Sequence, residues 1–149
     1  MSVQLRPARA NDYDWIINVV DDWWGRPVVA ALPRLFLDHF ALTSLVAVLD
    51  GLPVGFLIGF PSPSIAGLAY VQFVGVDPEQ RHHGVGRQLY AEFIVRCKAL
   101  GCVSVRAATS SGNAPSIAFH RRLGFSVSDP IDGYDGPGTS MVKFELDVS

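Results

Sequence analysis

The sequence predicts a mixed α/β fold in which a single sheet carries helices on both faces. Segments of alternating apolar residues, typical of strands, take turns with segments whose apolar residues recur at helical spacing. The expected order is strand, two helices, three strands, helix, strand, helix and two strands, and it places helices between strands that share one sheet. A glycine turn at Gly84 and Gly86 marks the change from strand to helix.

Length and composition limit the class of protein. A chain of 149 residues with 49% hydrophobic content suits a single domain over residues 1–149, and its apolar surplus leaves room for a homodimer surface. The net charge of −2 argues against nucleic acid as a partner. No apolar run approaches the roughly 20 residues that span a bilayer, so we expect no membrane contact. The two cysteines, Cys97 and Cys102, fit neither a disulfide framework nor a metal site, which predicts a cytoplasmic location and no metal.

The N-terminal half predicts strands and helices from local signals. A first strand is expected at residues 3–7. Asn11 is the expected cap of the first helix, because Asp12 and Asp14 follow in its first turn, near the positive end of the helix dipole. A short second helix is expected at residues 33–40.

The middle of the chain predicts a hairpin. Strands at residues 44–49 and 54–60 are joined by Asp50-Gly51, a strong signal for a tight turn. A loop rich in proline and serine follows at residues 61–64, and a strand at residues 69–76 leads into the glycine turn.

The C-terminal half predicts two more helices and three strands. The helix after Gly84 ends at Gly101, and the next helix is capped by Asn113 and closed by Gly124. A strand at residues 103–108 separates them, and strands at residues 125–127 and 141–146 form a closing pair. The apolar stripe expected on the first of these helices consists of Leu89, Phe93, Cys97 and Leu100.

Residues 80–87, Gln-Arg-His-His-Gly-Val-Gly-Arg, carry the clearest chemical signal. A glycine turn that opens a helix exposes backbone N–H groups at the positive end of the helix dipole, where they bind phosphate. A P-loop would need Lys and Ser or Thr after Gly86, and a dinucleotide fingerprint would need a third glycine where Leu89 stands. The pattern that fits is Arg-x-x-Gly-x-Gly, beginning at Arg81, with Asp77-Pro78 before it.

This loop resembles the acyl-coenzyme A loop of the GNAT N-acetyltransferase superfamily. A second family-like element follows at the expected interval, residues 113–125 with the sequence Asn-Ala-Pro-Ser-Ile-Ala-Phe-His-Arg-Arg-Leu-Gly-Phe. The resemblance implies a mostly antiparallel sheet and acetyl-CoA as cosubstrate. It also implies direct attack on the thioester by a primary amine of a small molecule or peptide.

The resemblance further implies which residues hold the cofactor. Val74 and Val76 would offer backbone groups to the pantetheine arm, and the Val74 N–H would also stabilise the oxyanion, a catalytic role. The alternatives are that the strand at residues 69–76 is a plain core strand and that the glycine loop is an ordinary tight turn. The full set of expected cofactor-binding residues is Val74, Val76, Arg81, His82, His83, Gly84, Val85, Gly86, Arg87, Asn113, Ser116, Phe119 and Arg122.

His120 is the expected second catalytic residue. The family often has a tyrosine at this position, whose hydroxyl protonates the departing thiolate, and an imidazole can act as a general acid near neutral pH. The alternative is a half-exposed helix residue, with the proton supplied by water or by a tyrosine. The strand at residues 69–76 carries no carboxylate, so the general base is either an acid from the N-terminal half or a chain of waters.

Acceptor-binding candidates come from three segments. Between the first two helices, Asp22 and Trp24 belong to a pair of carboxylates followed by a pair of indoles, which would suit a cationic amine. The alternative is that Trp23 belongs to the core and that Asp21 and Asp22 are solvated charges at the end of the helix. Tyr70 is a polar side chain on the strand before the glycine turn. Tyr134 lies in a loop rich in glycine and proline, and such loops often carry function.

The sequence therefore predicts an acetyl-CoA-dependent N-acetyltransferase. The absent tyrosine and strand carboxylate keep one alternative open, a non-catalytic acyl-CoA-binding regulatory module.

Overall fold

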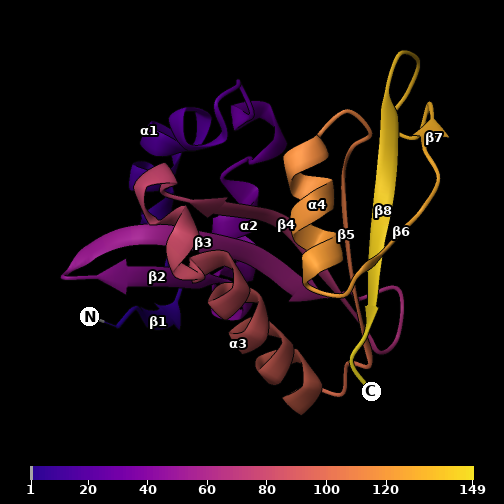
Figure 1. Ribbon diagram of the computed structural model, residues 1–149. Helices are drawn as coiled ribbons and strands as arrows, with labels where there is room; N and C mark the ends of the chain where they lie inside the picture. Colours follow the sequence, from indigo (N-terminus) through magenta and orange to yellow (C-terminus); the bar gives the residue numbers. More distant parts are fainter. Residues whose placement is uncertain (1) are drawn as a thin grey trace.

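The structure, a computed structural model, describes residues 2–149 and contains one eight-stranded sheet. Its strand order is β1-β2-β3-β4-β5-β8-β6, with β7 paired to β8 beside this path (Figure 1). All neighbouring strands are antiparallel except β4 and β5, which confirms the predicted mixed, mostly antiparallel sheet. The strands are β1 (Gln4–Pro7), β2 (Leu45–Leu49), β3 (Leu52–Pro61), β4 (Leu68–Val76), β5 (Ser104–Ser110), β6 (Ser126–Val127), β7 (Ile131–Asp132) and β8 (Ser140–Asp147).

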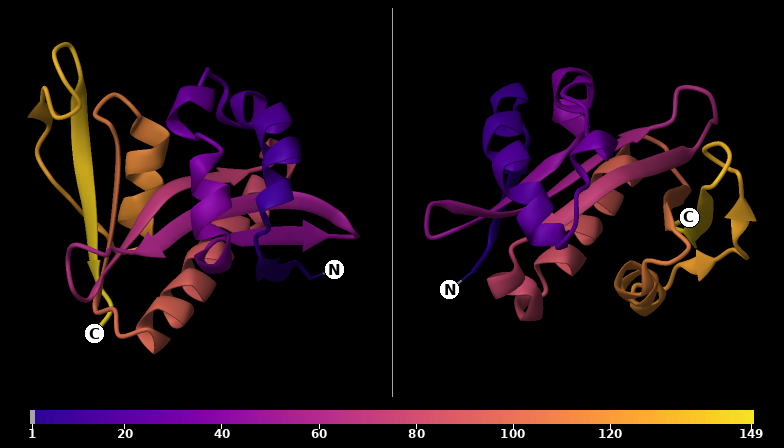
Figure 2. Two further views of the ribbon diagram at one scale, coloured as in Figure 1. Left: turned by 180° about the vertical axis from the view of Figure 1, so that it is seen from behind. Right: turned by 90° about the horizontal axis from the view of Figure 1, so that it is seen from above.

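Helices cover both faces of the sheet, as the sequence predicts. Figure 2 shows α1 (Tyr13–Trp24) and α2 (Leu35–Phe40) on one face, and α3 (Val85–Ala99) and α4 (Ala114–Arg122) on the other. Each face has its own apolar core, one that includes Ile16, Phe56 and Phe73 and one that includes Leu89, Phe93 and Phe144. Short 3₁₀ helices complete the chain: η1 (Ala10–Asp12), η2 (Val29–Ala31), η3 (Ala41–Thr43) and η4 (Pro78–His83). No helix within residues 2–149 is long and apolar enough to cross a membrane.

The hairpin between β2 and β3 forms as predicted. Asp50 (φ 53°) and Gly51 (φ 81°) both adopt left-handed backbone, which is what a two-residue turn needs to match the twist of its strands. Asn113 also caps α4 as predicted, since its side-chain oxygen accepts a hydrogen bond from the Ser116 N–H at 3.3 Å.

Two details of the helix predictions are wrong. The helical segment around α1 begins with η1, and the polar anchor there is Asp12 rather than Asn11. The Asp12 carboxylate is buried and binds the Arg6 guanidinium at 2.8 and 2.9 Å, the Trp15 Nε1–H at 2.9 Å and the Arg9 N–H at 2.7 Å. Leu100 leaves the apolar stripe of α3 and is 63% exposed, because the helix has already ended at Ala99.

The junction of β4 and β5 shapes the rest of the molecule. The two strands pair only over residues 68–71 and 104–107, and beyond Val71 and Ala107 they separate (Figure 1). Just past that point, the register between β3 and β4 pairs Gly59 with Val71 but Ile58 with Phe73, so Gln72 is an extra, bulged residue. A bulge bends its strand and increases the local twist, which carries β4 away from β5.

Replacement of Asp12 by alanine is expected to destabilise the fold by about 3 kcal/mol, because it leaves Arg6 without its partner and the Trp15 N–H unsatisfied. Urea unfolding of purified protein would measure the change. The matched control is Asp14→Ala, whose ion pair with Arg34 is exposed and should alter stability by less than about 0.5 kcal/mol. Equal effects of the two substitutions would contradict the role of Asp12.

Candidate active site

A cleft of about 530 Å³ opens where β4 and β5 separate. Its walls come from the end of α1, the second half of β4, the first turns of α3, the end of β5 and one side of α4. Among the predicted site residues, those that line it are Trp24, Val74, Val76, Arg81, Gly86, Asn113, Ser116, Phe119, His120 and Arg122.

The backbone of β4 presents hydrogen-bonding groups to this cleft. The Asp77 N–H donates to the Val54 carbonyl of β3 at 2.9 Å. Because backbone groups of successive residues point to opposite sides of a strand, the N–H and C=O groups of Gly75 and Phe73 point toward β3 as well. Val74 and Val76 consequently point their N–H and C=O groups away from β3, toward the side that β5 has left. The Trp24 Nε1–H confirms this direction, because it donates to the Val74 carbonyl at 3.0 Å.

The glycine turn is tied to the end of α1. The Asp77 side chain accepts the Glu79 N–H at 3.0 Å and so begins η4, a helical turn that the sequence does not predict. The Arg81 guanidinium donates to the Trp23 carbonyl, which joins this turn to α1. Gly84 adopts φ 73° and directs the chain into α3, whose first N–H groups are free to bind an anion.

Gly86 is required for close packing. A Cβ atom at Gly86 would lie 3.0 Å from the Phe119 ring, so a side chain here would push α3 and α4 apart. Phe119 and Gly86 both line the cleft, which gives the second glycine of the motif a packing role beside its place in the loop.

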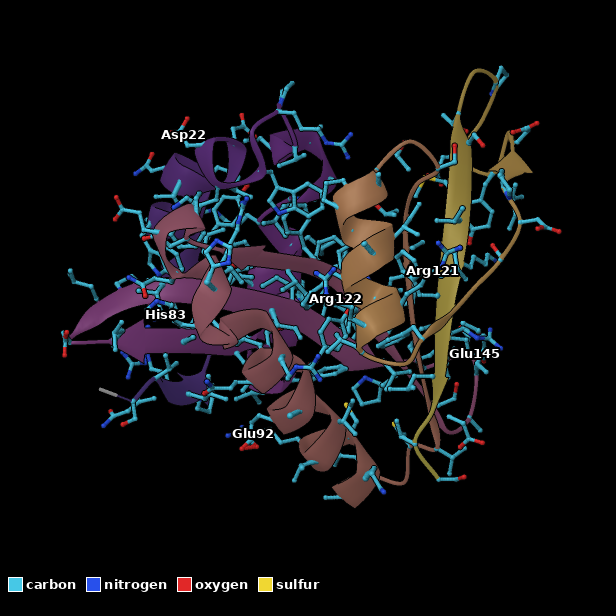
Figure 3. The ribbon with its side chains drawn as sticks, in the orientation of Figure 1. Asp22, His83, Glu92, Arg121, Arg122 and Glu145 are labelled. Atoms are coloured by element: carbon cyan, nitrogen blue, oxygen red, sulfur yellow. The ribbon has the colours of Figure 1, made fainter. Side chains whose placement is uncertain are left out.

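Other predicted loop residues lie outside the cleft lining. His82, His83 and Arg87 are exposed, and Val85 is fully buried in the core beneath the loop. His83 is the last residue of η4, and Figure 3 shows it just before the start of α3. Any contact of these residues with a ligand remains a prediction.

The start of α4 is fixed by Asn113. Besides its cap, Asn113 donates from Nδ2 to the Thr109 hydroxyl at 3.1 Å, so both ends of its amide are engaged within the protein. At the other end of α4, Arg121 and Arg122 leave the helix on opposite sides in Figure 3. Only Arg122 lines the cleft.

His120 is buried and both of its ring nitrogens are engaged. Nδ1 lies 2.8 Å from the Ser116 carbonyl, which can only accept, so Nδ1 carries the proton. Nε2 then accepts from the Tyr90 hydroxyl at 2.7 Å. The ring stacks on Phe144 with 4.0 Å between centroids. Burial lowers the pKa of His120 from its ordinary value of 6.5, and burial raises the pKa of Tyr90.

This geometry does not favour His120 as a direct general acid. In its neutral form the only ring proton is held by the Ser116 carbonyl, and the charged form is disfavoured by burial. The sequence shows that His120 stands where the family often has a tyrosine. It does not reveal that the hydroxyl of Tyr90, on another helix, binds the Nε2 atom of His120.

The predicted acceptor residues are divided. Trp24 lines the cleft, but Asp22 is exposed and points outward from α1 in Figure 3, so the interpretation of Asp21 and Asp22 as a pair of ligands for a cation is not supported. Tyr70 and Tyr134 are absent from the cleft lining. Tyr70 packs near Phe60, and Tyr134 is 49% exposed with the Lys143 ammonium 4.7 Å from its ring.

Two residues gain roles that the sequence does not predict. The Asp21 carboxylate accepts the N–H groups of Val28 at 2.7 Å and Val29 at 3.1 Å, and so organises the loop after α1. Arg26, in this loop, lines the cleft with its guanidinium 5.6 Å from the centre of the Trp24 ring. The sequence gives no signal for this role, because the direction of the Arg26 side chain depends on contacts distant in sequence.

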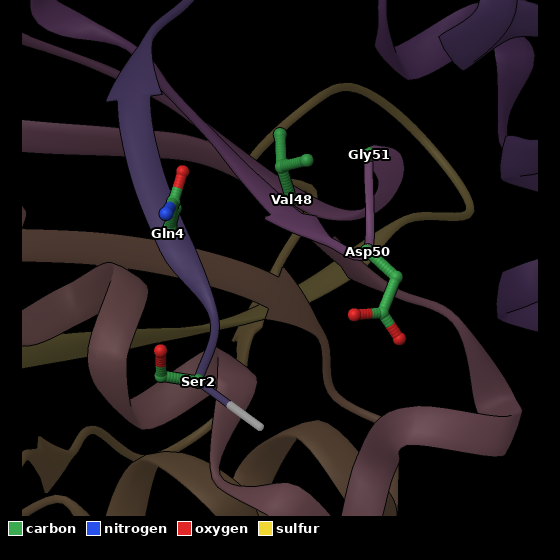
Figure 4. A pocket seen from close by; sticks show the side chains of 5 residues that line it. All are labelled: Ser2, Gln4, Val48, Asp50 and Gly51. Atoms are coloured by element: carbon green, nitrogen blue, oxygen red, sulfur yellow. The ribbon is translucent and has the colours of Figure 1, made fainter.

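A second hollow lies at the other edge of the sheet (Figure 4). It is lined by Ser2, Gln4, Val48, Asp50 and Gly51, and its charged group is the Asp50 carboxylate, which repels an anionic cofactor. Within residues 2–149, no cluster of three or more histidine, cysteine or acidic side chains is arranged to hold a metal ion.

Comparison with known proteins agrees with these observations. Residues 12–125 match the family described as acetyltransferase (GNAT) family. The chain is 32% identical over 142 residues to the L-methionine sulfoximine/L-methionine sulfone acetyltransferases of Pseudomonas aeruginosa and Pseudomonas paraeruginosa, covering 86% of this chain and 83% of each relative. It is 33% identical over 84 residues to the L-2,4-diaminobutyric acid acetyltransferase of Nocardia farcinica, covering 56% of this chain and 44% of that relative.

Solved structures share the whole fold. A protein from Desulfovibrio desulfuricans described as a GNAT-family acetyltransferase superposes with a TM-score of 0.85 at 25% identity, covering 99% of this chain and 100% of that one. A structure from Salmonella typhimurium that holds acetyl-CoA superposes with a TM-score of 0.75 at 21% identity, covering 100% of this chain and 95% of that one.

Replacement of Trp24 by phenylalanine is expected to lower kcat by about 3- to 10-fold, because it removes the donor that fixes the Val74 carbonyl and thereby the direction of the Val74 N–H. Steady-state kinetics at saturating acetyl-CoA would measure the change. Trp23→Phe is the control: Trp23 stacks on Phe56 and has no hydrogen bond to β4 within residues 2–149. An unchanged kcat in Trp24→Phe would exclude the indole from positioning β4.

The buried His120 predicts a loss of stability in mild acid. Its folded pKa lies below its unfolded value near 6.5, so the unfolded state binds more protons, and this stability is complete above about pH 6.5 and falls below it. Unfolding free energies measured between about pH 7.5 and pH 5 should fall by at most about 1.4 kcal/mol per pH unit from this group. His120→Gln should flatten that slope, whereas His39→Gln, which removes an exposed histidine, should not.

Proposed function

Because the chain belongs to the GNAT family of acetyltransferases and transfers an acetyl group from acetyl-CoA to an amine, we propose that its acceptor is a small amino acid or a close analogue, a primary amine that also carries a carboxylate. Nothing in the comparisons supports a non-catalytic acyl-CoA-binding module.

The charge of the cleft carries this proposal. Three arginines line it, Arg26 from the loop after α1, Arg81 from η4 and Arg122 from α4. Within the described residues 2–149 no aspartate or glutamate lines it. A purely cationic amine would therefore enter a cleft of its own charge, whereas an amine with a carboxylate would find a counter-charge. The Pseudomonas and Nocardia relatives are named for acceptors that are amino acids or their analogues, which agrees with this class.

The cleft fits an acyl-coenzyme A. Its cations and the N–H groups at the start of α3 suit phosphates. The edge of β4 at Val74 and Val76, which has no strand partner on the β5 side, suits the amides of a pantetheine arm, which can pair with it as a strand would. When bound, acetyl-CoA supplies the activated acetyl group. We assign Arg81, Arg122 and the backbone of residues 84–86 to its phosphates, with Val76 beside its arm.

The residues of β4 supply the electrostatic part of catalysis. The Val74 N–H faces the cleft, and a fixed amide donor there stabilises negative charge that develops on a carbonyl oxygen during acyl transfer. Its position is held by Trp24 and by the β3 neighbour. Most of the rate enhancement then comes from positioning and from this donor, without a covalent enzyme intermediate.

Proton transfers are assigned to water. No carboxylate lines the cleft in residues 2–149, so water removes the proton of the amine. His120, which the sequence predicts as a general acid, is assigned instead a role as a positioning residue beside the cleft. It holds Tyr90 and the first turn of α4, while the departing thiolate takes its proton from water that reaches the cleft.

The predicted cytoplasmic location and homodimer remain part of this proposal. Cys97 and Cys102 are both free and buried, which agrees with a reducing compartment. Burial raises the pKa of the Cys97 thiol to about 12, so it is not a nucleophile.

The acceptor class is tested by the release of free thiol from acetyl-CoA. The panel contains L-methionine sulfone, L-2,4-diaminobutyrate, a polyamine and a short peptide with a free N-terminus. We expect turnover with at least one amino acid and little with the polyamine. Preferred turnover of the polyamine or the peptide would overturn the proposed acceptor class.

The cofactor site is tested by thermal unfolding. Acetyl-CoA at about 100 times its Kd should raise the Tm of the wild-type protein by several degrees, about 5–10 °C. Gly84→Glu should abolish this rise, because it places a carboxylate in the phosphate-binding turn.

Gly101→Glu is the matched control for Gly84→Glu. Both glycines have left-handed backbone and open space around a new Cβ atom, but Gly101 lies at the far end of α3. Both variants should lose about 1–2 kcal/mol of stability, and only Gly84→Glu should lose the response to acetyl-CoA. A normal response in Gly84→Glu would remove the turn from the cofactor site.

A further inference from the structure

The loop that follows α1 is held in a defined conformation. Gly25 adopts φ 72° and its N–H bonds the Asp21 carbonyl at 2.9 Å, while the Asp21 carboxylate accepts the N–H groups of Val28 and Val29. Val28 is buried in the core of the α1 face. The loop is thus anchored on both sides of Arg26, which stands at its exposed apex.

Arg26 lies next to the place where the acetyl group must react. Its guanidinium is 5.6 Å from the ring centre of Trp24, and the same indole donates to the Val74 carbonyl at 3.0 Å. A single aromatic ring therefore separates this cation from the backbone of the proposed oxyanion donor. Further along, η2 is tied to the bulge of β4, because the Gln72 amide donates to the Ala31 carbonyl at 2.9 Å.

Arg26 has no anionic partner in residues 2–149. Among the described residues no ion pair and no hydrogen bond engages its guanidinium, whereas Arg34, at the N-cap of α2, binds Asp14. A free guanidinium stacked on an indole in a cleft without carboxylates suits a planar anion, because its N–H groups match a carboxylate in two parallel hydrogen bonds.

The other two cleft arginines come from other elements. Arg81 belongs to the glycine turn and bonds the Trp23 carbonyl, and Arg122 ends α4. Arg26 is on the α1–α2 side, bordered by Trp24 and η2. Arg81 thus also reaches the end of α1, but it already donates to a backbone carbonyl there, whereas the guanidinium of Arg26 has no partner within residues 2–149.

We propose that Arg26 is a specificity-determining residue that binds the carboxylate of the acceptor and so selects amino acids over simple amines. This inference rests on the proposed acceptor class and assigns it to one side chain. With the carboxylate on Arg26, the neighbouring amine is directed toward the Val74 edge of β4. The cation also disfavours a protonated amine beside it, which favours the nucleophilic form.

The test compares matched pairs of acceptors. L-Methionine sulfone and 3-(methylsulfonyl)propan-1-amine differ only in the carboxylate, and L-2,4-diaminobutyrate is paired with 1,3-diaminopropane. Values of kcat/KM are compared at equal concentrations of neutral amine for the wild-type protein, Arg26→Gln, Arg26→Lys and Arg34→Gln. Arg34→Gln is the control because it removes an exposed arginine outside the cleft lining.

We expect the wild-type protein to prefer an amino acid over its decarboxylated partner by about 10-fold or more. Arg26→Gln should abolish this preference through a loss of about 10- to 100-fold on the amino acid alone, mainly in KM. Arg26→Lys should recover part of the preference, because an ammonium keeps the positive charge but lacks the paired N–H donors of a guanidinium. Arg34→Gln should behave as wild type, and the acetyl-CoA-dependent rise in Tm should be the same in all four proteins.

Three results would overturn the inference. An intact preference in Arg26→Gln would show that the carboxylate is bound elsewhere. A loss of the response to acetyl-CoA in Arg26→Gln would assign Arg26 to the cofactor phosphates. If the wild-type protein acetylated only the decarboxylated amines, or none of the compounds, the proposed acceptor class itself would be rejected. The role of Arg26 in binding the acceptor carboxylate would be rejected with it.

Discussion

The separation of β4 from β5 is the constraint on which the rest of the structure depends. Up to Val71 and Ala107 the two strands form an ordinary parallel pair, and beyond it the bulge at Gln72 turns β4 away. Backbone N–H and C=O groups that lose a strand partner must find another, and those of Val74 and Val76 face the resulting cleft. The sheet thereby creates a place for an extended ligand with amide groups, without any dedicated side chain.

The two helical layers complete this cleft from opposite faces of the sheet. Trp24 reaches it from α1 and bonds Val74, whereas Phe119 reaches it from α4 and packs on Gly86. Arg81 joins the glycine turn to the last residues of α1. A shift of α1 would therefore be felt at the turn and at the strand edge together.

The parts of the fold that the sequence predicts correctly are those set by local rules. Asp50-Gly51 forms its turn because left-handed backbone is available to these two residues, and Asn113 caps α4 because its side chain reaches a backbone group three residues away. The parts that it does not predict depend on residues far apart. From the sequence Asp21 resembles a solvated charge at a helix end, but in the structure it accepts the N–H of Val28. Likewise, His120 resembles an available acid, but the Tyr90 hydroxyl binds its Nε2 atom.

The same distinction separates the two halves of the active site. The proposed cofactor half consists mainly of backbone. Its signal in the sequence is therefore the set of positions where a side chain is excluded or left-handed backbone is needed, such as Gly86 and Gly84. The acceptor half depends on side chains carried by a loop, and their direction follows from long-range contacts such as those of Asp21 and Trp24. A motif can therefore identify the cosubstrate, whereas the acceptor class can be inferred only from the three-dimensional positions of the charged side chains around the cleft. In the proposed assignment the acceptor is recognised by a loop residue, Arg26, which contributes nothing to the pairing of β4 with β3. Acceptor preference can then change with little effect on the proposed oxyanion donor of β4.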